Sequence, residues 1–374
     1  MSKHIFLLIL ISALAFSCQE SKKNTPMTNS SYTFFLGTYT DGDSQGIYKF
    51  EMDSLGQLKM LGLVAKSDNP SFLAFANHQK TLLVANEMKY EDGMGSVESY
   101  QIGDSLQLIS RKPSGGAHPC FVTANVEGVV LAANYTGGNI GYLQVDEAGK
   151  LSDLLDVQQH SGSGTVVGRQ DEPHAHSVWF QPNTNQIAAV DLGTNELWLS
   201  SIDMAKHQFS SDIRKVALAD GAGPRHLVFH PNGKFVYIIS ELNNTISCFQ
   251  ISETKEFKLL STISSLPAHF EAYSATADIH ISSDGKYLYG SNRGHNSIAI
   301  FSIQENGDLH SIGFESTRGD HPRNFSLSPD DKFLLVANKN TNNIVCFQRD
   351  SLSGSLTFVD EVKAPSPVCI LFEN

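Results

Sequence analysis

The chain has 374 residues, and its 27 Lys and Arg against 39 Asp and Glu give a formal net charge of −12 at pH 7. Such an acidic chain, without a block of Lys and Arg interleaved with aromatic residues, argues against DNA or RNA as partners. The five cysteines form no CxxC motif and no Cys/His ligand spacing, which argues against a zinc site. We expect the cysteines beyond the N-terminal one to be buried free thiols.

The N-terminal residues 1–17 have the features of a signal peptide. A basic start precedes an apolar run at 5–16, which is shorter than the roughly 20 residues that a bilayer span needs. The run ends in AFSC, which resembles a lipobox, so we expect cleavage before Cys18 and a lipid on its sulfur. The common Leu three residues before the cysteine is missing, which leaves an ordinary signal cleavage open. Residues 18–30 are polar and predict a flexible tether, so we expect an exported lipoprotein of the cell envelope that meets the membrane only through its lipid.

From residue 31 onward the sequence predicts an all-β fold. Short apolar runs alternate with turn signals, and no long segment has helical period. One phrase recurs: a polar or Pro-containing start, an apolar strand, a tight turn, a second strand and a polar pair. The clearest copies are GPRHLVFHPNGKFVYIISELNNTISCF from Gly223, ATADIHISSDGKYLYGSNRGHNSIAIF from Ala275 and HPRNFSLSPDDKFLLVANKNTNNIVCF from His321.

The spacing of these phrases indicates a seven-bladed β-propeller. The equivalent positions are Ser71, Cys120, His176, Arg225, Ala277, Arg323 and Val368, separated by 49, 56, 49, 52, 46 and 45 residues. Four strands and their turns need roughly 40–50 residues, which is one blade. The last phrase stops after one inner strand, and the strands at 33–36 and 46–50 have no partner, so we expect the two ends to complete one blade together. A two-domain β-sandwich or a parallel β-helix does not explain this period, and we assign 31–374 to a single propeller domain.

Propeller geometry predicts where the repeats converge. The innermost strand of each blade leaves one face of the ring and the second strand returns to it, so two positions per blade meet at one mouth of the central channel. The first set of positions is the one aligned above. The second set, where the next strand ends, comprises Glu87, Tyr135, Leu192, Glu241, Arg293 and Lys339. A position kept for packing would hold one residue type, whereas these positions hold charges and aromatics, so we expect the functional site at this mouth.

The residue types at the mouth point to chemistry on an anionic or carbonyl group. The predicted catalytic residues are Glu241, Arg225, His176 and His174, and the predicted substrate-binding residues are Arg293, Arg323, Tyr135, Glu87 and Lys339. Arginines bind carboxylate or phosphate bidentately, Glu241 would act as a base, and one of the two histidines would shuttle the proton. A structural role stays open, because buried Arg/Glu pairs also clip blades together and a histidine at a strand start often only bonds a backbone carbonyl. For Cys120 we expect packing.

The residues at these positions resemble a known family. FLGTYTDGDSQGIYKF, HAHSVWF with VDLGTNEL, GAGPRHLVFHPNGKFVYIISELNNTI and SDGKYLYGSNRGHNSI together resemble the 6-phosphogluconolactonase-type lactonase family, which also includes carboxymuconate-lactonizing propellers. In the muconate enzymes a His, two Arg and a Glu are implicated, and the matching positions here are His174 or His176, Arg225, Glu241 and Arg293. Related lactonase propellers bind calcium through acidic and Asn ligands. Here Arg and Lys occupy many of these positions, so we expect no required metal and no cofactor.

The resemblance implies hydrolysis of a sugar lactone, with 6-phosphogluconolactone as the nominal substrate. Export favours an unphosphorylated aldonolactone, because phosphorylated sugar intermediates are cytosolic. Two alternatives stay open: cycloisomerisation of a muconate-like dicarboxylate by the same side chains, and a non-enzymatic propeller that binds a glycan or a partner protein. No helix or apolar stripe calls for a dimer, so we expect a monomer.

Overall fold

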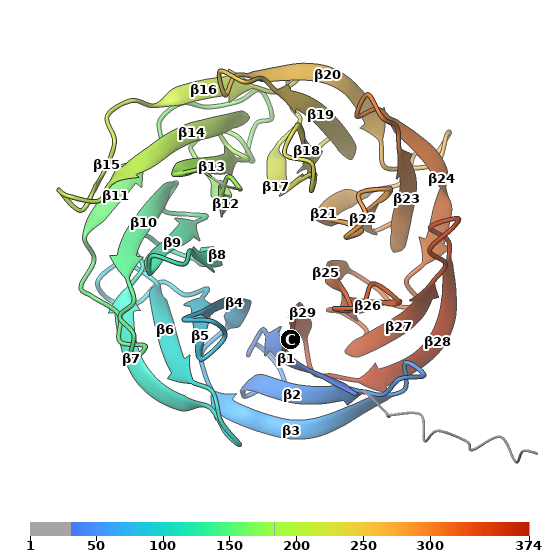
Figure 1. Cartoon of the computed structure of the whole chain (residues 1–374), viewed down its shortest axis with the longest axis horizontal. Coiled ribbons are helices and arrows are strands. Elements are labelled where there is room, and N and C mark those ends of the chain that lie inside the picture. The colour runs from blue at the N-terminus through green and yellow to red at the C-terminus, as the bar shows by residue number, and fades with distance from the viewer. Residues whose placement is uncertain (1–30, 183, 374) are drawn as a thin grey trace, which may run out of the picture.

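In the computed structural model, which describes residues 31–182 and 184–373, the chain forms seven antiparallel sheets arranged as blades around a central axis (Figure 1). The prediction of a seven-bladed all-β propeller is confirmed. The expected signal peptide at 1–17, Cys18 and the tether that follows it lie outside the described residues. No helix in the described part of the chain has the length and apolar character to cross a bilayer.

The blades follow one another in chain order, each with its innermost strand nearest the axis. Blades 1 to 3 contain β4 (Pro70–Ala76), β5 (Thr81–Asn86), β6 (Ser96–Gln101) and β7 (Gln107–Pro113); β8 (Pro119–Ala124), β9 (Val129–Asn134), β10 (Asn139–Gln144) and β11 (Asp156–Gln159); β12 (Ala175–Phe180), β13 (Gln186–Asp191), β14 (Glu196–Asp203), β15 (Gln208–Phe209) and β16 (Arg214–Ala217). Blades 4 to 6 contain β17 (Pro224–Phe229), β18 (Phe235–Ser240), β19 (Thr245–Ile251) and β20 (Phe257–Ser264); β21 (Ala275–Ile281), β22 (Tyr287–Arg293), β23 (Ser297–Ile303) and β24 (Leu309–Ser316); β25 (Pro322–Leu327), β26 (Phe333–Asn338), β27 (Asn343–Arg349) and β28 (Leu356–Lys363).

Blade 7 joins the two ends of the chain. It contains β29 (Pro367–Phe372), β1 (Tyr32–Thr38), β2 (Gly46–Met52) and β3 (Leu58–Lys66), with β29 innermost. Strand β29 pairs antiparallel with β1, so that Phe34 lies opposite Phe372 and Leu36 opposite Ile370. This pairing confirms the predicted closure of the ring by N-terminal and C-terminal strands, and it completes blade 7 as a four-stranded sheet.

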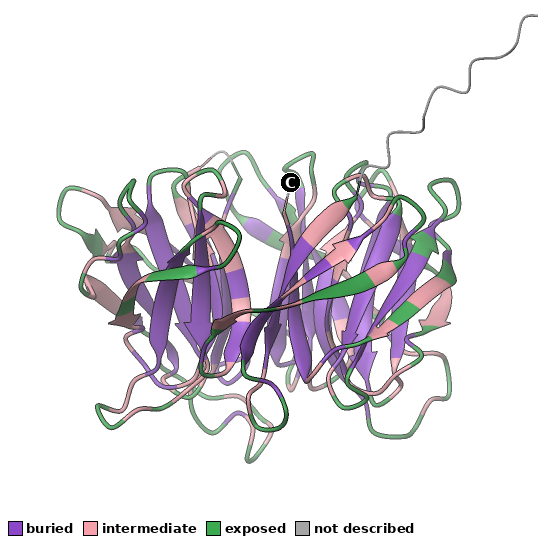
Figure 2. Ribbon diagram, turned by 90° about the horizontal axis from the view of Figure 1, so that it is seen from below, coloured by how far each residue is buried: buried purple, intermediate pink, exposed green. Residues whose placement is uncertain are grey.

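The burial of each strand follows its place in the blade (Figure 2). Second strands such as TLLVAN of β5, VVLAAN of β9 and FLLVAN of β26 are fully buried, with an apolar middle and a buried Asn at the end. These strands are covered on both faces by neighbouring blades, so they need no polar side. The outermost strands β3, β7, β20 and β28 alternate between covered and exposed residues instead. The hydrophobic core is therefore a ring of clusters between blades rather than one central mass.

Two further expectations about local structure are confirmed. The hairpin turns HPNGK and SSDGK place Gly233 at φ 70° and Gly285 at φ 71°, and the variant SPDDK holds Asp331 at φ 61° in the same turn position. Aspartate is among the few residues other than glycine that tolerate this left-handed conformation. The four cysteines of the described residues, Cys120, Cys248, Cys346 and Cys369, are all buried and free.

Strand register brings the two predicted sets of positions to one face, which we call the channel mouth. In blade 4, the backbone N–H of Glu241 donates to the carbonyl of Gly223, the residue before the inner strand. The equivalent bonds join Glu87 to Asn69, Tyr135 to His118, Leu192 to His174 and Lys339 to His321. Blade 7 repeats the bond with the N–H of Tyr39 on the carbonyl of Ser366, which makes Tyr39 the seventh member of the second set.

Candidate active site

The centre of the channel mouth is a carboxylate held by three guanidinium groups. Arg169 Nη2 lies 2.6 Å from Glu241 Oε1, while Arg225 Nε and Arg293 Nη2 lie 3.1 and 2.7 Å from Oε2. Arg169 comes from the connection between blades 2 and 3, Arg225 from blade 4 and Arg293 from blade 5, and Glu241 is buried. The predicted meeting of Arg225, Glu241 and Arg293 is therefore found, with Arg169 as an additional member.

Two of these arginines are also tied to the backbone of blade 5, Arg225 from blade 4 and Arg293 from within blade 5. Arg225 Nη1 donates to the carbonyl of Ala277, and Arg293 donates to the carbonyls of Ala275 and Thr276 at 3.2 and 2.7 Å. All three carbonyls belong to β21, so Arg225 joins blade 4 to blade 5, while Arg293 is fixed within blade 5. These contacts are the structural role left open for the arginines, and their chemical role stays a prediction.

A buried acid and imidazole lie beneath Arg225. His226 Nδ1 donates to Asp278 Oδ1 at 2.7 Å, and His226 Nε2 lies 3.4 Å from Arg225 Nη1, which donates to it. Asp278 also contacts His280 Nε2 at 3.1 Å and accepts a bond from Asn324. Asp278 therefore orients the His226 ring, and His226 accepts a hydrogen bond from the guanidinium of Arg225.

The charges fix the protonation states of the central group. Burial alone would raise the pKa of Glu241, but the guanidinium groups of Arg293, Arg225 and Arg169 hold that pKa well below its usual range. Burial, with repulsion from Arg323 and Arg293, lowers the pKa of Arg225 to about 9, which leaves it charged at neutral pH. A carboxylate with three cationic partners is a weak base, so the geometry favours Glu241 as an organiser of the arginines over Glu241 as the proton acceptor.

His174 is held in one tautomer at the edge of the mouth. Its Nδ1 lies 3.1 Å from the carbonyl oxygen of Tyr135, and because a carbonyl only accepts, Nδ1 carries the hydrogen. The imidazole stacks on the Tyr135 ring with centroids 4.5 Å apart, and its backbone N–H donates to Asp191. In the neutral imidazole, the other ring nitrogen, Nε2, then has the lone pair that a general base requires.

His176 differs from His174 in its surroundings, although only one residue separates them. Its side chain is buried deeper in the channel, with Nδ1 3.6 Å from Cys120 Sγ and its ring 5.4 Å from that of His226. Burial, followed by the charges of Arg225, His226 and Arg323, lowers the pKa of His176 well below its usual value. The two predicted histidines thus lie at different depths, and His174 is the one at the mouth.

The opposite side of the mouth is formed by blades 1, 6 and 7. Arg323 Nη2 lies 3.5 Å from Glu87 Oε2, to which the Tyr39 hydroxyl donates at 2.8 Å. The Arg323 guanidinium and Lys339 Nζ lie 5.3 and 5.2 Å from the centroid of the Tyr39 ring, within cation–π range. Lys339 also lies 3.5 Å from Asp41. Arg323, Glu87 and Lys339 are therefore gathered around Tyr39. The repeat alignment predicts the first three residues at this mouth but does not predict Tyr39.

The sequence alignment did not single out Arg169, Tyr39 or the buried pair His226 and Asp278, nor His321, which lies near Arg293, Arg323 and Lys339. Arg169 comes from residues 160–174 between β11 and β12, a connection that matches no other blade, although the long step of 56 residues marks an insertion there. Tyr39 was missed because blade 7 is split between the two ends of the chain. Aligning FLGTYT with LAANYT would have shown that Tyr39 occupies the position in blade 7 that Tyr135 occupies in blade 2. His321 precedes Arg323 by two residues, as His174 precedes His176 by two, and that parallel was a usable signal.

The buried histidines predict how stability depends on pH. Burial and the nearby arginines lower the pKa of His321 and of His226 to about 4, so the folded chain excludes protons that the unfolded chain binds near pH 6.5. Stability is then unaffected above about pH 6.5 and falls as the pH drops toward about 4, by at most roughly 1.4 kcal/mol per pH unit for each histidine. Urea midpoints at pH 7.5, 6 and 5 measure this, and His321→Gln should show a shallower fall. A midpoint that stays level or rises on acidification would contradict the assignment.

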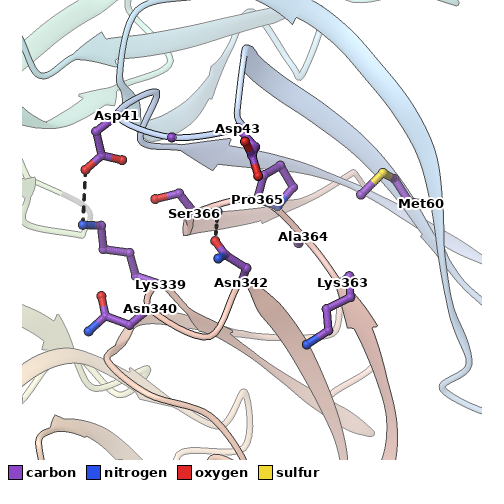
Figure 3. A pocket seen from close by; sticks show the side chains of 11 residues that line it. Asp41, Asp43, Met60, Lys339, Asn340, Asn342, Lys363, Ala364, Pro365 and Ser366 are labelled. Atoms are coloured by element: carbon purple, nitrogen blue, oxygen red, sulfur yellow. Dashed lines mark hydrogen bonds and ion pairs between the residues drawn. The ribbon is translucent and has the colours of Figure 1, made fainter.

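A larger cavity lies beside the mouth, between blades 6 and 7 (Figure 3). Its volume is about 540 Å³, and its lining includes Asp41, Asp43, Lys339 and Lys363. Lys339 and Asp41 face each other at its edge and also belong to the mouth. Within the channel itself, Ser71, Cys120, Arg225 and Arg323 enclose a space of only about 10 Å³. The channel is thus filled by side chains, and a small molecule would meet the arginines from the mouth.

No group of three or more His, Cys, Asp or Glu side chains suited to a metal ion is found within 31–182 and 184–373. The expectation that no metal is required stays a prediction. The arrangement that is present offers positively charged hydrogen-bond donors and one imidazole with a free lone pair. Such a set can stabilise a developing oxyanion and remove a proton from water.

Comparison with known proteins gives one consistent result. Residues 33–372 match the family described as "Lactonase, 7-bladed beta-propeller". A 6-phosphogluconolactonase of Bacillus subtilis is 36% identical over 91% of this chain and 98% of its own length, and one of Formosa agariphila is 37% identical over 86% and 94%. Among solved structures, the periplasmic gluconolactonase of Pseudomonas aeruginosa superposes with a TM-score of 0.88 at 32% identity, covering 92% of this chain and 99% of that one.

Proposed function

The chain belongs to the family of seven-bladed β-propeller lactonases, and on this basis we propose that it hydrolyses a sugar lactone at the channel mouth. The observation that carries the proposal is the convergence of Arg225, Arg293 and Arg169 on Glu241 beside His174. Relatives named 6-phosphogluconolactonase and gluconolactonase support the substrate class. The phosphorylation state of the substrate is part of the proposal and is taken up in the next subsection.

The mechanism follows from the protonation states at the mouth. A water molecule attacks the lactone carbonyl carbon while His174 Nε2 takes one of its protons. The negative charge that forms on the carbonyl oxygen is stabilised by the guanidinium groups of Arg225 and Arg293. The bond between the carbonyl carbon and the ring oxygen then breaks, and the imidazolium returns the proton to that oxygen. The product is the open hydroxy acid, whose carboxylate remains next to the arginines until it leaves.

Glu241 has a supporting role in this scheme. Three guanidinium groups would repel one another at this distance, and the carboxylate holds them with their donors in one place. We assign the proton transfer to His174 because Glu241 is held ionised and its lone pairs are occupied. His176 lies beneath as a neutral group next to Arg225 and Cys120 and is proposed to keep the channel floor in position.

Export of the protein is a further part of the proposal. Residues 1–18 read as a signal peptide followed by a lipidated cysteine, and the similar Pseudomonas aeruginosa protein is described as periplasmic. We propose that this chain acts in the cell envelope and reaches its substrate there. Labelling with a radioactive fatty acid, lost in Cys18→Ala, tests the lipid anchor.

The first test is turnover of a lactone panel by purified residues 19–374. The panel contains glucono-, 6-phosphoglucono- and galactonolactone, with rates corrected for spontaneous ring opening. We expect turnover of at least one lactone and its loss in His174→Gln. Well-folded protein that opens none of them would exclude hydrolysis of this substrate class. A muconate-type dicarboxylate is then the next substrate to assay, because cycloisomerisation would use the same His, Arg and Glu.

A further inference from the structure

The arginines at the mouth differ in how many hydrogen-bond donors they have already used. A guanidinium group has five N–H donors. Arg225 bonds Glu241, the carbonyl of Ala277 and His226. Arg293 bonds Glu241 and the carbonyls of Ala275 and Thr276. These two arginines are buried, and each is held by three contacts within the protein.

Arg169 is the exception among the arginines on Glu241. Its Nη2 contacts Glu241 Oε1 and the Tyr135 hydroxyl at 2.6 and 3.3 Å. Its Nε and Nη1 make no hydrogen bond with any residue that the structure describes, and 40% of its side chain is exposed, against 2% for Arg225 and 9% for Arg293. Arg225 and Arg293 each keep one nitrogen unbonded within the described residues as well, Nη2 and Nη1, but their side chains are buried, so Arg169 is the arginine of this cluster that offers both free donors and exposed surface to a ligand.

The backbone around Arg169 is firmly anchored although it lies in a long connection. The next residue, Gln170, is completely buried. Its Nε2 donates to the carbonyl of Leu192 at 2.8 Å, and its Oε1 accepts from the N–H groups of Thr165 and Val166 at 3.0 and 3.1 Å. The guanidinium of Arg169 is therefore presented over the mouth by a fixed arm rather than by a freely moving loop, which lowers the entropy cost of binding.

The charges of the mouth indicate what this arm would bind. The side chains in mutual contact there include five cations and three carboxylates. The cations are Arg169, Arg225, Arg293, Arg323 and Lys339, and the carboxylates are Glu241, Glu87 and Asp41. His176 and His321 add no charge at neutral pH, because their pKa values are lowered. A positive excess at the one mouth of an otherwise acidic protein favours an anionic ligand.

We propose that Arg169 is the specificity residue of the site, and that it binds an anionic substituent, phosphate or carboxylate, of the lactone substrate. The step rests on the proposed lactonase function and refines its substrate class. The ligand anion takes the free Nε and Nη1 donors of Arg169, while Arg225 and Arg293 continue to hold Glu241. Phosphorylated sugars are cytosolic, so an enzyme proposed to act in the cell envelope would meet a carboxylate rather than a phosphate at this cationic mouth. The lactone of an aldaric acid has such a carboxylate.

The test compares one neutral and two anionic lactones: gluconolactone, 6-phosphogluconolactone and glucarolactone. For Arg169→Gln we expect kcat/KM to fall about 10- to 100-fold on the anionic lactones, mainly through KM, since a charge-assisted bond is lost. On gluconolactone the loss should be clearly smaller, because that lactone has no anionic group and only the contact of Arg169 with Glu241 is removed. The anionic lactone with the larger loss identifies phosphate or carboxylate as the preferred group.

Arg111→Gln is a matched control, because Arg111 has the same kind of environment away from the mouth. Its Nη2 contacts Oε1 of the buried Glu98, and 42% of its side chain is exposed. It lies on β7, the outermost strand of blade 1. An equal loss on all three lactones in Arg169→Gln, or a loss of the anionic preference in Lys339→Gln and not in Arg169→Gln, would overturn the proposal.

A binding measurement separates this proposal from the lactonase function. Inorganic phosphate should raise the melting temperature of the wild type and of Arg111→Gln, and Arg169→Gln should lose most of that increase. If no lactone is opened but this difference is found, the anion site stands and the proposed function fails. Citrate serves as the carboxylate probe beside phosphate. If lactones are opened but neither phosphate nor citrate raises the melting temperature of the wild type more than that of Arg169→Gln, the assignment of Arg169 is wrong.

Discussion

Glu241→Ala is expected to lower the free energy of unfolding by about 3–5 kcal/mol and to remove measurable lactone turnover. The substitution leaves Arg225 and Arg293 buried without their shared carboxylate, and Arg169 then adds a third unbalanced charge nearby. Truncating one partner of a buried ion pair is costly because the remaining charge is neither hydrated nor paired. Urea unfolding followed by tryptophan fluorescence measures the change, at a protein concentration where turnover is assayed in parallel.

Glu98→Gln is the control for this loss. Glu98 is also buried and accepts bonds from Arg111, Ser67, Asn86 and Tyr100, but it lies in β6 of blade 1 away from the mouth. It should lower stability while leaving kcat/KM unchanged in the folded protein. A Glu241→Ala variant that unfolds at the wild-type urea midpoint would show that the three arginines do not depend on the carboxylate.

His174→Gln is expected to lower kcat by about 10²- to 10⁴-fold while the free energy of unfolding changes little. Glutamine can keep the bond to the Tyr135 carbonyl that the Nδ1–H makes, but it has no lone pair of comparable basicity at the position of Nε2. The loss should therefore appear in kcat, with KM near the wild-type value. Substrates with better leaving groups should lose less, because less proton transfer is needed.

His176→Gln provides the comparison that separates the two histidines. His176 is buried against Cys120 and the ring of His226, so its replacement should lower the urea midpoint more than the His174 substitution does. Its effect on kcat should be the smaller of the two in protein shown to be folded. The reverse order, with kcat lost at His176 and kept at His174, would assign the proton transfer to the deeper residue.

The repeat carried most of the information that the sequence held about the fold. Each blade repeats the same order of strand, turn and strand in the sequence, and few known architectures have a repeat period near 49 residues. Because a blade position fixes a place in space, alignment of three repeats brought Arg225, Glu241 and Arg293 to one mouth without any structure. The ring closure was accessible for the same reason, since a propeller cannot leave one blade half-formed.

The repeat alignment could not predict residues or properties that lie outside the repeated pattern. Arg169 lies in an insertion with no counterpart in other blades, so no alignment assigns it a place. The weak basicity of Glu241 was hidden as well, because it depends on how many cations share one carboxylate and not on residue type. The different surroundings of His174 and His176 depend on the carbonyl of Tyr135 and on depth in the channel. Both are features of the tertiary structure that the sequence does not show.

The antiparallel pairing of β1 with β29 also sets the face of the ring from which the described chain starts. Thr38 pairs with Pro367 at the mouth, whereas Phe34 pairs with Phe372 toward the opposite face. The first described residues of the chain therefore start from the face away from the arginines. With the lipid anchor proposed at Cys18, the membrane would lie on the side of that far face. The arginines would then open outward, away from the lipid headgroups, where a dissolved sugar acid lactone can reach them without passing between protein and bilayer.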